Sequence, residues 1–216
     1  MPEEVLPRLV LWGVSTSRTL RAHWALHELG LAYQSRPIKP RTGETKTAEF
    51  TALNPRQKIP LLQDGDFAIA ESPAIAAYLS DTYGTAETAL IPRASRERAT
   101  WLEWCFYVMT ELDATSLYVI RRHGALKHIY GEAPGAVDGA TEYFRTQLRH
   151  AEQALLDGRP FLVGTAFTTA DMLLTTCLTW AADYGVPVTP ACQAYAQRMT
   201  ARPGYLAAEA ANQSPL

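Results

Sequence analysis

Residues 54–73 constrain the fold of this 216-residue chain more than any other segment. Within them, Asp64-Gly65 separates two short apolar runs, which is a strong signal for a β-hairpin. Ser72 stands where the N-cap of a helix is expected, and Pro73 occupies the first helical position, where its missing N–H costs nothing. The segment therefore predicts a hairpin whose second strand leads directly into a helix.

Pro60 adds information about function, because proline cannot donate a hydrogen bond to a strand ladder and is confined to edges, first residues or bulges. We therefore expect a strand that begins at Pro60 and has one exposed edge. An exposed edge beside a helix N-terminus suits a peptide-like, anionic ligand. The backbone of Ile59 is placed to pair with the main chain of such a ligand, and the N–H groups after Glu71 to hold a carboxylate.

Short strands alternate with helices in the first 84 residues. Strands are expected at 8–12 and 31–36 and in the hairpin, and helices from Arg18 and from Ser72. Residues 47–53 fit either a short helix or irregular structure. The order β-α-β-α-β-β-α predicts a small mixed sheet in an α/β, thioredoxin-like domain spanning residues 1–84.

Residues 84–92 lack periodicity and are interpreted as a linker, and nearly everything after them is helical. An apolar stretch covers 93–122, and an amphipathic helix is expected over 136–156. Thr168-Thr169-Ala170-Asp171 forms a capping box with Asp in place of Glu, which opens a nearly uncharged helix. We predict an all-helical second domain over 93–216.

Composition excludes several classes of function. The formal net charge of −2 leaves no electrostatic footprint for nucleic acid or an anionic membrane, and no apolar run is long enough to span a bilayer. The three cysteines are far apart, and the N-terminus lacks a signal-peptide pattern, so we expect a cytoplasmic protein. His23 and His27 are expected to face solvent, and no spacing of ligating residues indicates a metal site.

Two stretches carry a resemblance to the cytosolic glutathione transferase family, whose segment reads roughly Asn-Pro-x-Gly-Lys-Val-Pro, a hairpin, and then Glu-Ser-x-Ala-Ile-x-x-Tyr-Leu. The corresponding stretches here are Asn54-Pro55-Arg56-Gln57-Lys58-Ile59-Pro60 and Glu71-Ser72-Pro73-Ala74-Ile75-Ala76-Ala77-Tyr78-Leu79. Gln57 stands where the family usually has glycine. Phe161-Leu162-Val163-Gly164 and the capping box after it resemble the family's second signature. The resemblance implies a thioredoxin-like N-terminal domain followed by an all-helical C-terminal domain.

The resemblance to the serine-type (theta/phi/zeta-like) branches implies a catalytic serine at the start of the first helix, four residues before an arginine. Ser17 fits because it precedes Arg21 by four, and Ser15 is the alternative. A serine hydroxyl and free helix N–H groups lower the pKa of a bound thiol from its usual value of about 8.5. The competing interpretation is that Ser17 is only the N-cap of that helix.

The resemblance also implies how glutathione, the co-substrate, is held. Glu71 accepts from the γ-glutamyl ammonium and Ser72 donates to the neighbouring carboxylate, while the backbone of Ile59, before a cis Pro60, pairs with the cysteinyl part. The glycyl carboxylate is assigned to Lys58, with Lys39 and Arg41 as competitors. The second-substrate pocket is assigned to five residues: Val14, Tyr107, Val108, Glu111 and Leu112.

The function implied is a glutathione S-transferase, a detoxification enzyme that transfers the glutathione thiolate to an electrophilic, largely apolar small molecule, with peroxide reduction as a related activity. The cysteine-type branches need a thiol in the first loop, and no cysteine precedes Cys105. The resemblance further implies a homodimer without metal. The alternative is a non-catalytic binding or regulatory protein that keeps the fold.

Overall fold

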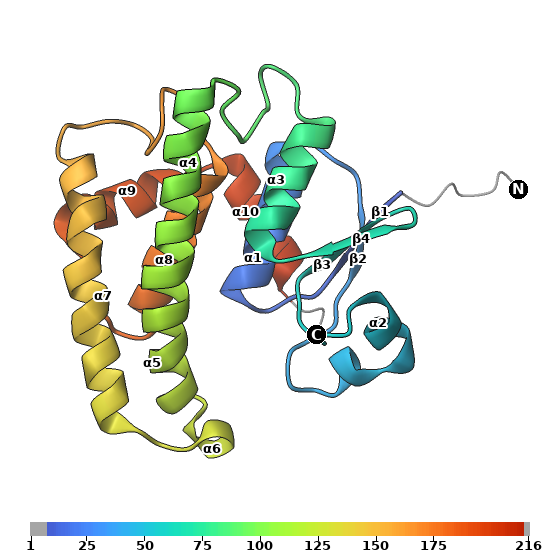
Figure 1. Cartoon of the computed structure of the whole chain (residues 1–216), viewed down its shortest axis with the longest axis horizontal. Helices are drawn as coiled ribbons and strands as arrows, with labels where there is room; N and C mark the ends of the chain where they lie inside the picture. Colours follow the sequence, from blue (N-terminus) through green and yellow to red (C-terminus); the bar gives the residue numbers. More distant parts are fainter. Residues whose placement is uncertain (1–7, 214–216) are drawn as a thin grey trace, which may run out of the picture. The chain divides into compact units, whose positions relative to one another are not determined.

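A computed structural model describes residues 8–213 of the chain. They form two compact units, one containing the described residues up to 91 together with 202–213, and the other residues 92–201 (Figure 1). The last helix, α10 (Pro203–Asn212), packs against α1 (Ser17–Glu28) and so belongs to the first unit. The domain predicted over 93–216 therefore differs from the second unit in its final residues.

The first unit contains the predicted mixed sheet, with strands in the order β2-β1-β3-β4. Its strands are β1 (Leu9–Trp12), β2 (Gln34–Arg36), β3 (Leu61–Asp64) and β4 (Phe67–Ala70). β1 runs parallel to β2 and antiparallel to β3, with Leu11 opposite Leu62, and β3 and β4 form the predicted antiparallel hairpin. This is the topology expected of a thioredoxin-like domain.

Helices of the first unit begin close to the expected residues. They are α1, α2 (Ala48–Leu53), α3 (Ser72–Tyr83) and α10, with a short 3-10 turn at Glu44–Lys46. Thr47 caps α2 by accepting a hydrogen bond from the Phe50 N–H, which selects the helical alternative for this segment. Phe50 is fully buried and stacks at a tilt on Trp12, so α2 packs against the sheet.

Asp64 fastens the end of β3 to α3. Its buried carboxylate accepts hydrogen bonds from the hydroxyls of Tyr78, at 2.7 Å, and Tyr83, and pairs with Arg8. Burial alone would raise the pKa of Asp64, but these donors lower it overall. The hairpin and the following helix are thus held as one piece, which fixes where the start of α3 lies.

The second unit consists of helices only among its described residues. They are α4 (Ser95–Tyr107), a π-helix (Val108–Leu117), α5 (Tyr118–His123), α6 (Lys127–Tyr130), α7 (Pro134–Leu155), α8 (Thr169–Asp183) and α9 (Pro190–Thr200). The apolar stretch predicted over 93–122 is thus three consecutive helical segments with a wide π-turn in the middle. Almost every residue of α8 is buried, as its lack of charge predicts.

The capping box predicted at the start of α8 is present, and Asp171 extends it into a buried network. Its carboxylate accepts from the Thr168 N–H at 2.8 Å, the Leu162 N–H at 2.7 Å and the Tyr195 hydroxyl at 2.5 Å. Burial raises the pKa of Asp171, and these donors oppose that rise. One side chain thus holds the start of α8, the loop before it and α9.

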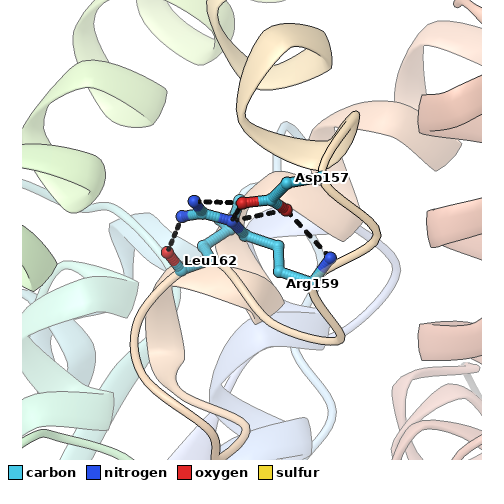
Figure 2. A network of polar contacts seen from close by, with 3 residues as sticks. All are labelled: Asp157, Arg159 and Leu162. Atoms are coloured by element: carbon cyan, nitrogen blue, oxygen red, sulfur yellow. Dashed lines mark hydrogen bonds and ion pairs between the residues drawn. The ribbon is translucent and has the colours of Figure 1, made fainter.

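The loop from α7 to α8 is held by a small network of polar contacts, which Figure 2 shows. Arg159 binds Asp157 through its side chain, at 2.6 Å, and its backbone N–H, and also donates to the Leu162 carbonyl at 3.4 Å. Hydrogen bonds from Arg159 lower the pKa of Asp157 to about 2. This turn delivers Leu162 to the capping box of α8.

Candidate functional site

The Ile59–Pro60 peptide bond is cis, as predicted from the sequence. The loop between β1 and α1 lies directly against it, because a Cβ added to Gly13 would fall 2.6 Å from the Ile59 Cβ. Gly13 also has φ +112°, a conformation that other residues rarely adopt. Glycine at this position therefore allows the first loop and the cis-proline loop to meet.

Backbone N–H groups of the first loop are held by protein acceptors until α1 begins. The pairs are Gly13 to Arg36 O (2.9 Å), Val14 to Ile38 O (3.1 Å), Ser15 to Asn212 O (2.8 Å) and Thr16 to Thr19 Oγ1 (3.0 Å). The N–H of Ser17 comes next, at a helix start, where backbone donors lack intrahelical partners. Among the described residues no acceptor bonds to it, so it is a donor that a bound anion can use.

Thr16, and not Ser17, is the N-cap of α1. Its hydroxyl oxygen accepts from the Thr19 N–H at 3.0 Å, and the Thr19 hydroxyl oxygen accepts from the Thr16 N–H in return. The interpretation of Ser17 as a cap is therefore wrong, since Ser17 is the first residue of the helix. Its hydroxyl makes no hydrogen bond to residues 8–213, which leaves it available to a ligand. Ser15, the alternative, is exposed and has φ +67°.

His23 supports the first loop from behind and does not face solvent, contrary to the sequence-based expectation. Its Nε2 lies 3.2 Å from the Gly13 carbonyl oxygen and its Nδ1 lies 2.7 Å from the Tyr33 hydroxyl. A neutral ring that donates from Nε2 and accepts at Nδ1 satisfies both contacts. Burial lowers the pKa of His23 to about 4 and raises that of Tyr33 to about 12. The loop is therefore braced by an uncharged imidazole near neutral pH.

Glu71 lies at the start of α3 in a left-handed conformation, with φ 70°. It occupies the N-cap position, which makes Ser72 the first helical residue and corrects the expectation that Ser72 is the cap. The Glu71 carboxylate pairs with Arg56 at 2.6 Å on the surface. Ser72 is buried, and its hydroxyl makes no hydrogen bond within the described ranges. Sequence reasoning missed Arg56, although it lies inside the motif.

The loop before Pro60 has a defined shape. Asn54 accepts from the Arg56 N–H at 3.1 Å and donates to the Lys58 carbonyl at 2.8 Å. Gln57 has φ +53°, so it adopts the backbone conformation that glycine favours, and its side chain donates to Thr51 at 3.1 Å. Gln57, at the position where the family usually has glycine, thus adopts the positive φ that glycine favours.

Ile59 presents unpaired backbone groups beside this loop. Its N–H and C=O have no hydrogen-bond partner among residues 8–213, since β3 begins only at Leu61. The side chain of Lys58 is exposed, and Lys39 lies in the loop after β2, where its N–H donates to Glu44 at 3.0 Å. The expected strand with one exposed edge is not found, because β3 starts at Leu61 and pairs with β1 on one side and β4 on the other. The unpaired backbone groups lie just before it, at residue 59.

Residues assigned to the second-substrate pocket are mostly inaccessible. Val14, Val108 and Leu112 are each 0% exposed. Tyr107 is half-buried and donates to the Gln147 carbonyl at 2.6 Å. Glu111 is half-buried and accepts from Tyr143. Only these last two retain accessible surface that fits the assignment.

Metal-binding clusters and membrane-spanning helices are both absent from residues 8–213. No group of three or more His, Cys, Asp or Glu side chains there is arranged to hold a metal ion. No helix within residues 8–213 has both the length and the apolar composition to cross a membrane. Cys105, Cys177 and Cys192 are all buried, and burial raises the pKa of Cys105 to about 12, which makes it a poor nucleophile.

Comparison with known proteins agrees with this geometry. The profile of the glutathione S-transferase N-terminal domain matches residues 7–81, and that of the C-terminal domain matches residues 134–198. Glutathione S-transferase D7 of Drosophila melanogaster is 30% identical over 171 residues, covering 78% of this chain and 73% of the fly protein. Glutathione S-transferase theta-3 of Mus musculus is 28% identical over 180 residues, covering 81% and 74%.

Solved structures show the same architecture. The theta class glutathione S-transferase of Xanthomonas axonopodis pv. citri, solved with glutathione bound, superposes with a TM-score of 0.77 at 28% identity, covering 93% of this chain and 96% of that one. The glutathione transferase URE2P8 of Phanerochaete chrysosporium reaches a TM-score of 0.84 at 22% identity, covering 97% and 96%, which supports the fold. The chain belongs to the glutathione S-transferase family.

Proposed function

We propose that this protein is a glutathione transferase that transfers the thiolate of glutathione to an electrophilic, largely apolar small molecule. One observation carries the proposal: the cis-proline loop contacts both helix starts that a tripeptide thiol needs. Ile59 lies against Gly13 before α1, and Arg56 pairs with Glu71 at the start of α3. These contacts support a single glutathione site within the first unit, built from the loop before α1 and from the motif at residues 54–72.

Each part of glutathione has a matching group in this site. The free backbone of Ile59 pairs with the cysteinyl residue, as a strand edge pairs with an added strand. The Glu71 carboxylate accepts from the γ-glutamyl ammonium, and Ser72 with the N–H groups of α3 holds the adjoining carboxylate. Lys58 is assigned to the glycyl carboxylate, with Lys39 as the alternative.

The chemistry begins when the thiol releases its proton to solvent water. The Ser17 hydroxyl donates a hydrogen bond to the sulfur, and the partial positive charge at the start of α1 stabilises the thiolate further. The sulfur electron pair then attacks an electrophilic carbon, and the leaving group departs with its bonding electrons or the adduct is protonated. Ser15 is the alternative donor. Peroxide reduction starts from the same thiolate.

Assembly and location complete the proposal. We infer a cytoplasmic homodimer whose second-substrate site includes Tyr107 and Glu111. Sedimentation at micromolar concentration tests the dimer, and a monomer there contradicts it. Neither point affects the assignment of the glutathione site, whose residues all lie in the first unit.

Retention on immobilised glutathione tests the binding site. The wild type is expected to be retained, and Ser72→Ala and Glu71→Ala to be retained weakly, because each removes a contact to the γ-glutamyl end. Glu49→Ala is the matched control, since Glu49 is exposed on α2 of the same unit. Conjugation of a panel of electrophiles with glutathione then tests transfer. Retention without conjugation or peroxide reduction would instead support the non-catalytic alternative.

A further inference from the structure

Asn212, the last residue of α10, makes three hydrogen bonds to the first loop and the first turn of α1. Its carbonyl oxygen accepts from the Ser15 N–H at 2.8 Å, its Oδ1 lies 2.7 Å from the Thr19 hydroxyl, and its Nδ2 lies 3.2 Å from the Thr16 carbonyl oxygen. These bonds flank Ser17 on both sides in the sequence. Asn212 thus binds the segment around Ser17, to which the stabilisation of the thiolate is assigned.

Packing of α10 along α1 explains why Asn212 reaches this position. At the other end of α10, Arg202 forms an ion pair with Glu28 at 2.7 Å, and Tyr205 packs edge-on against Trp24 with the ring centroids 4.9 Å apart. The two helices therefore run antiparallel. Because the rise per residue is the same in both, ten residues of α10 carry the chain from the end of α1 back to its start.

Donors and acceptors at this contact fit one arrangement. The Thr19 hydroxyl has one proton and three oxygens in reach, Asn212 Oδ1 at 2.7 Å, the Thr16 carbonyl at 2.8 Å and Thr16 Oγ1 at 2.9 Å. The Thr16 hydroxyl carries its own proton, so it can donate to Thr19 Oγ1. When the Asn212 amide donates to the Thr16 carbonyl, the Thr19 proton goes to Oδ1, and the amide bridges both threonines. The side chain then fastens both residues of the capping box.

Ser15 is the residue that most needs this support. Its φ of +67° is an unfavourable conformation for a residue with a side chain, and such conformations persist only where surrounding contacts enforce them. Val14 before it is held by the Ile38 carbonyl, and Asn212 supplies the bond to Ser15 itself. The bond to Ser15 comes from the Asn212 backbone carbonyl, whereas the Asn212 side chain holds Thr16 and Thr19.

We propose that Asn212 is a positioning residue, which fixes the first loop so that the Ser17 hydroxyl and N–H meet the glutathione sulfur. This inference rests on the proposed function, because it assigns Asn212 a part in stabilising the thiolate. It predicts that loss of the Asn212 side chain changes the chemistry at the sulfur more than the affinity for the rest of glutathione, whose contacts lie at Ile59, Glu71 and Ser72.

The test is an ultraviolet titration of the thiolate of bound glutathione in the full-length wild type, Asn212→Ala and Gln213→Ala. Asn212→Ala is expected to move the thiol pKa toward the free value and to lower kcat near neutral pH about fivefold, the effect of one hydrogen bond. The KM for glutathione is expected to change less than kcat. Gln213→Ala, at the exposed neighbouring residue, is expected to match the wild type.

A second variant keeps the test decisive if Asn212→Ala does not fold. Asn212→Asp keeps the acceptor for Thr19 but loses the donor to the Thr16 carbonyl, so it is also expected to raise the thiol pKa. A lowered thiol pKa that persists in both variants overturns the positioning role and leaves the proposed function standing. A wild type that binds glutathione without lowering its thiol pKa overturns the proposed thiolate chemistry, and the positioning role with it.

Discussion

Arg56 and Glu71 illustrate how a surface contact bears on ligand binding at the scale of single residues. Both side chains are more than half exposed, so their ion pair adds little to stability. The same carboxylate is assigned to the ammonium group of glutathione. In the unliganded protein Arg56 therefore occupies the Glu71 carboxylate, and glutathione has to displace Arg56 in order to bind there.

Arg56→Ala should accordingly tighten glutathione binding. An exposed ion pair is worth less than about 1 kcal/mol, so its removal is expected to lower the Kd by about two- to fivefold without changing the unfolding transition. Calorimetric titration measures the Kd. Arg145→Ala, which removes the exposed pair with Glu142 in the second unit, is the matched control and should leave the Kd unchanged. Weaker binding by Arg56→Ala would show that Arg56 contacts the ligand itself.

His23 makes stability depend on pH. Burial lowers its folded-state pKa to about 4, while the unfolded chain has a value of about 6.5. Below pH 6.5, His23 is protonated in the unfolded state but stays neutral in the folded state. The free energy of unfolding should therefore fall as the pH drops toward 4, by on the order of 3 kcal/mol. Burial lowers the pKa of His27 as well, which acts in the same direction.

Denaturant titration at pH 7 and pH 5 checks this dependence. The loss of stability between the two pH values should be smaller in His23→Gln than in the wild type. His128→Gln, on the exposed surface of α6, should keep the wild-type loss. Equal losses in all three proteins would mean that other groups govern the acid response.

Several residues of the site could be predicted from sequence and others could not. Ile59-Pro60 and Glu71-Ser72 are neighbours in one motif, so their spacing carries the signal. His23 could not be placed, because its position on an apolar helix does not reveal the Gly13 carbonyl or Tyr33 that it contacts. Asn212 lies almost two hundred residues from its partners, and no local pattern marks such a contact.

At the scale of elements, the cap of α1 is Thr16, which is a different residue from Ser17, the proposed catalytic serine. Thr16→Ala removes the cap, so it should lower the free energy of unfolding by about 1 kcal/mol. Ser17→Ala removes a hydroxyl that bonds to none of the described residues, so it should leave stability close to that of the wild type. Denaturation curves of both variants check this. A larger loss in Ser17→Ala than in Thr16→Ala would return the capping role to Ser17.

The start of α8 should be the most sensitive point of the second unit. Asp171→Ala leaves the Leu162 and Thr168 N–H groups and the Tyr195 hydroxyl buried without their acceptor. The expected loss exceeds about 3 kcal/mol, measured as a shift of the denaturation midpoint. Asp138→Ala, which removes an exposed carboxylate on α7 of the same unit, should keep a midpoint near that of the wild type. Similar midpoints for both variants would contradict this account of the network.

The π-helix between α4 and α5 is a feature of the second unit that the sequence does not predict. Apolar content identified residues 93–122 as helical, but an extra residue in one turn leaves no trace in that pattern. Val108 and Leu112 are buried residues of this π-helix. Boundaries set by glycine, proline and capping residues, such as the start of α7 at Pro134, were predicted to within two residues.

At the scale of the whole molecule, the sequence predicts the two architectures because each has its own periodicity. Strands alternating with helices indicate the mixed sheet, and the helical pattern after residue 92 indicates the second unit. The return of α10 to the first unit was not predictable, since an amphipathic helix does not specify which partner it packs against. That return places Asn212 at the first loop, where it bonds to Ser15, Thr16 and Thr19.

Ultraviolet titration of the thiolate of bound glutathione, in the wild type and Ser17→Ala, is the most direct test of the central claim that the start of α1 stabilises it. The wild type should lower the thiol pKa below about 8.5, and Ser17→Ala should raise it again. Loss of a charge-assisted hydrogen bond should slow transfer near neutral pH by roughly ten- to a hundredfold while the Kd stays nearly constant. Bound glutathione whose thiol titrates at its free value in the wild type would contradict the account.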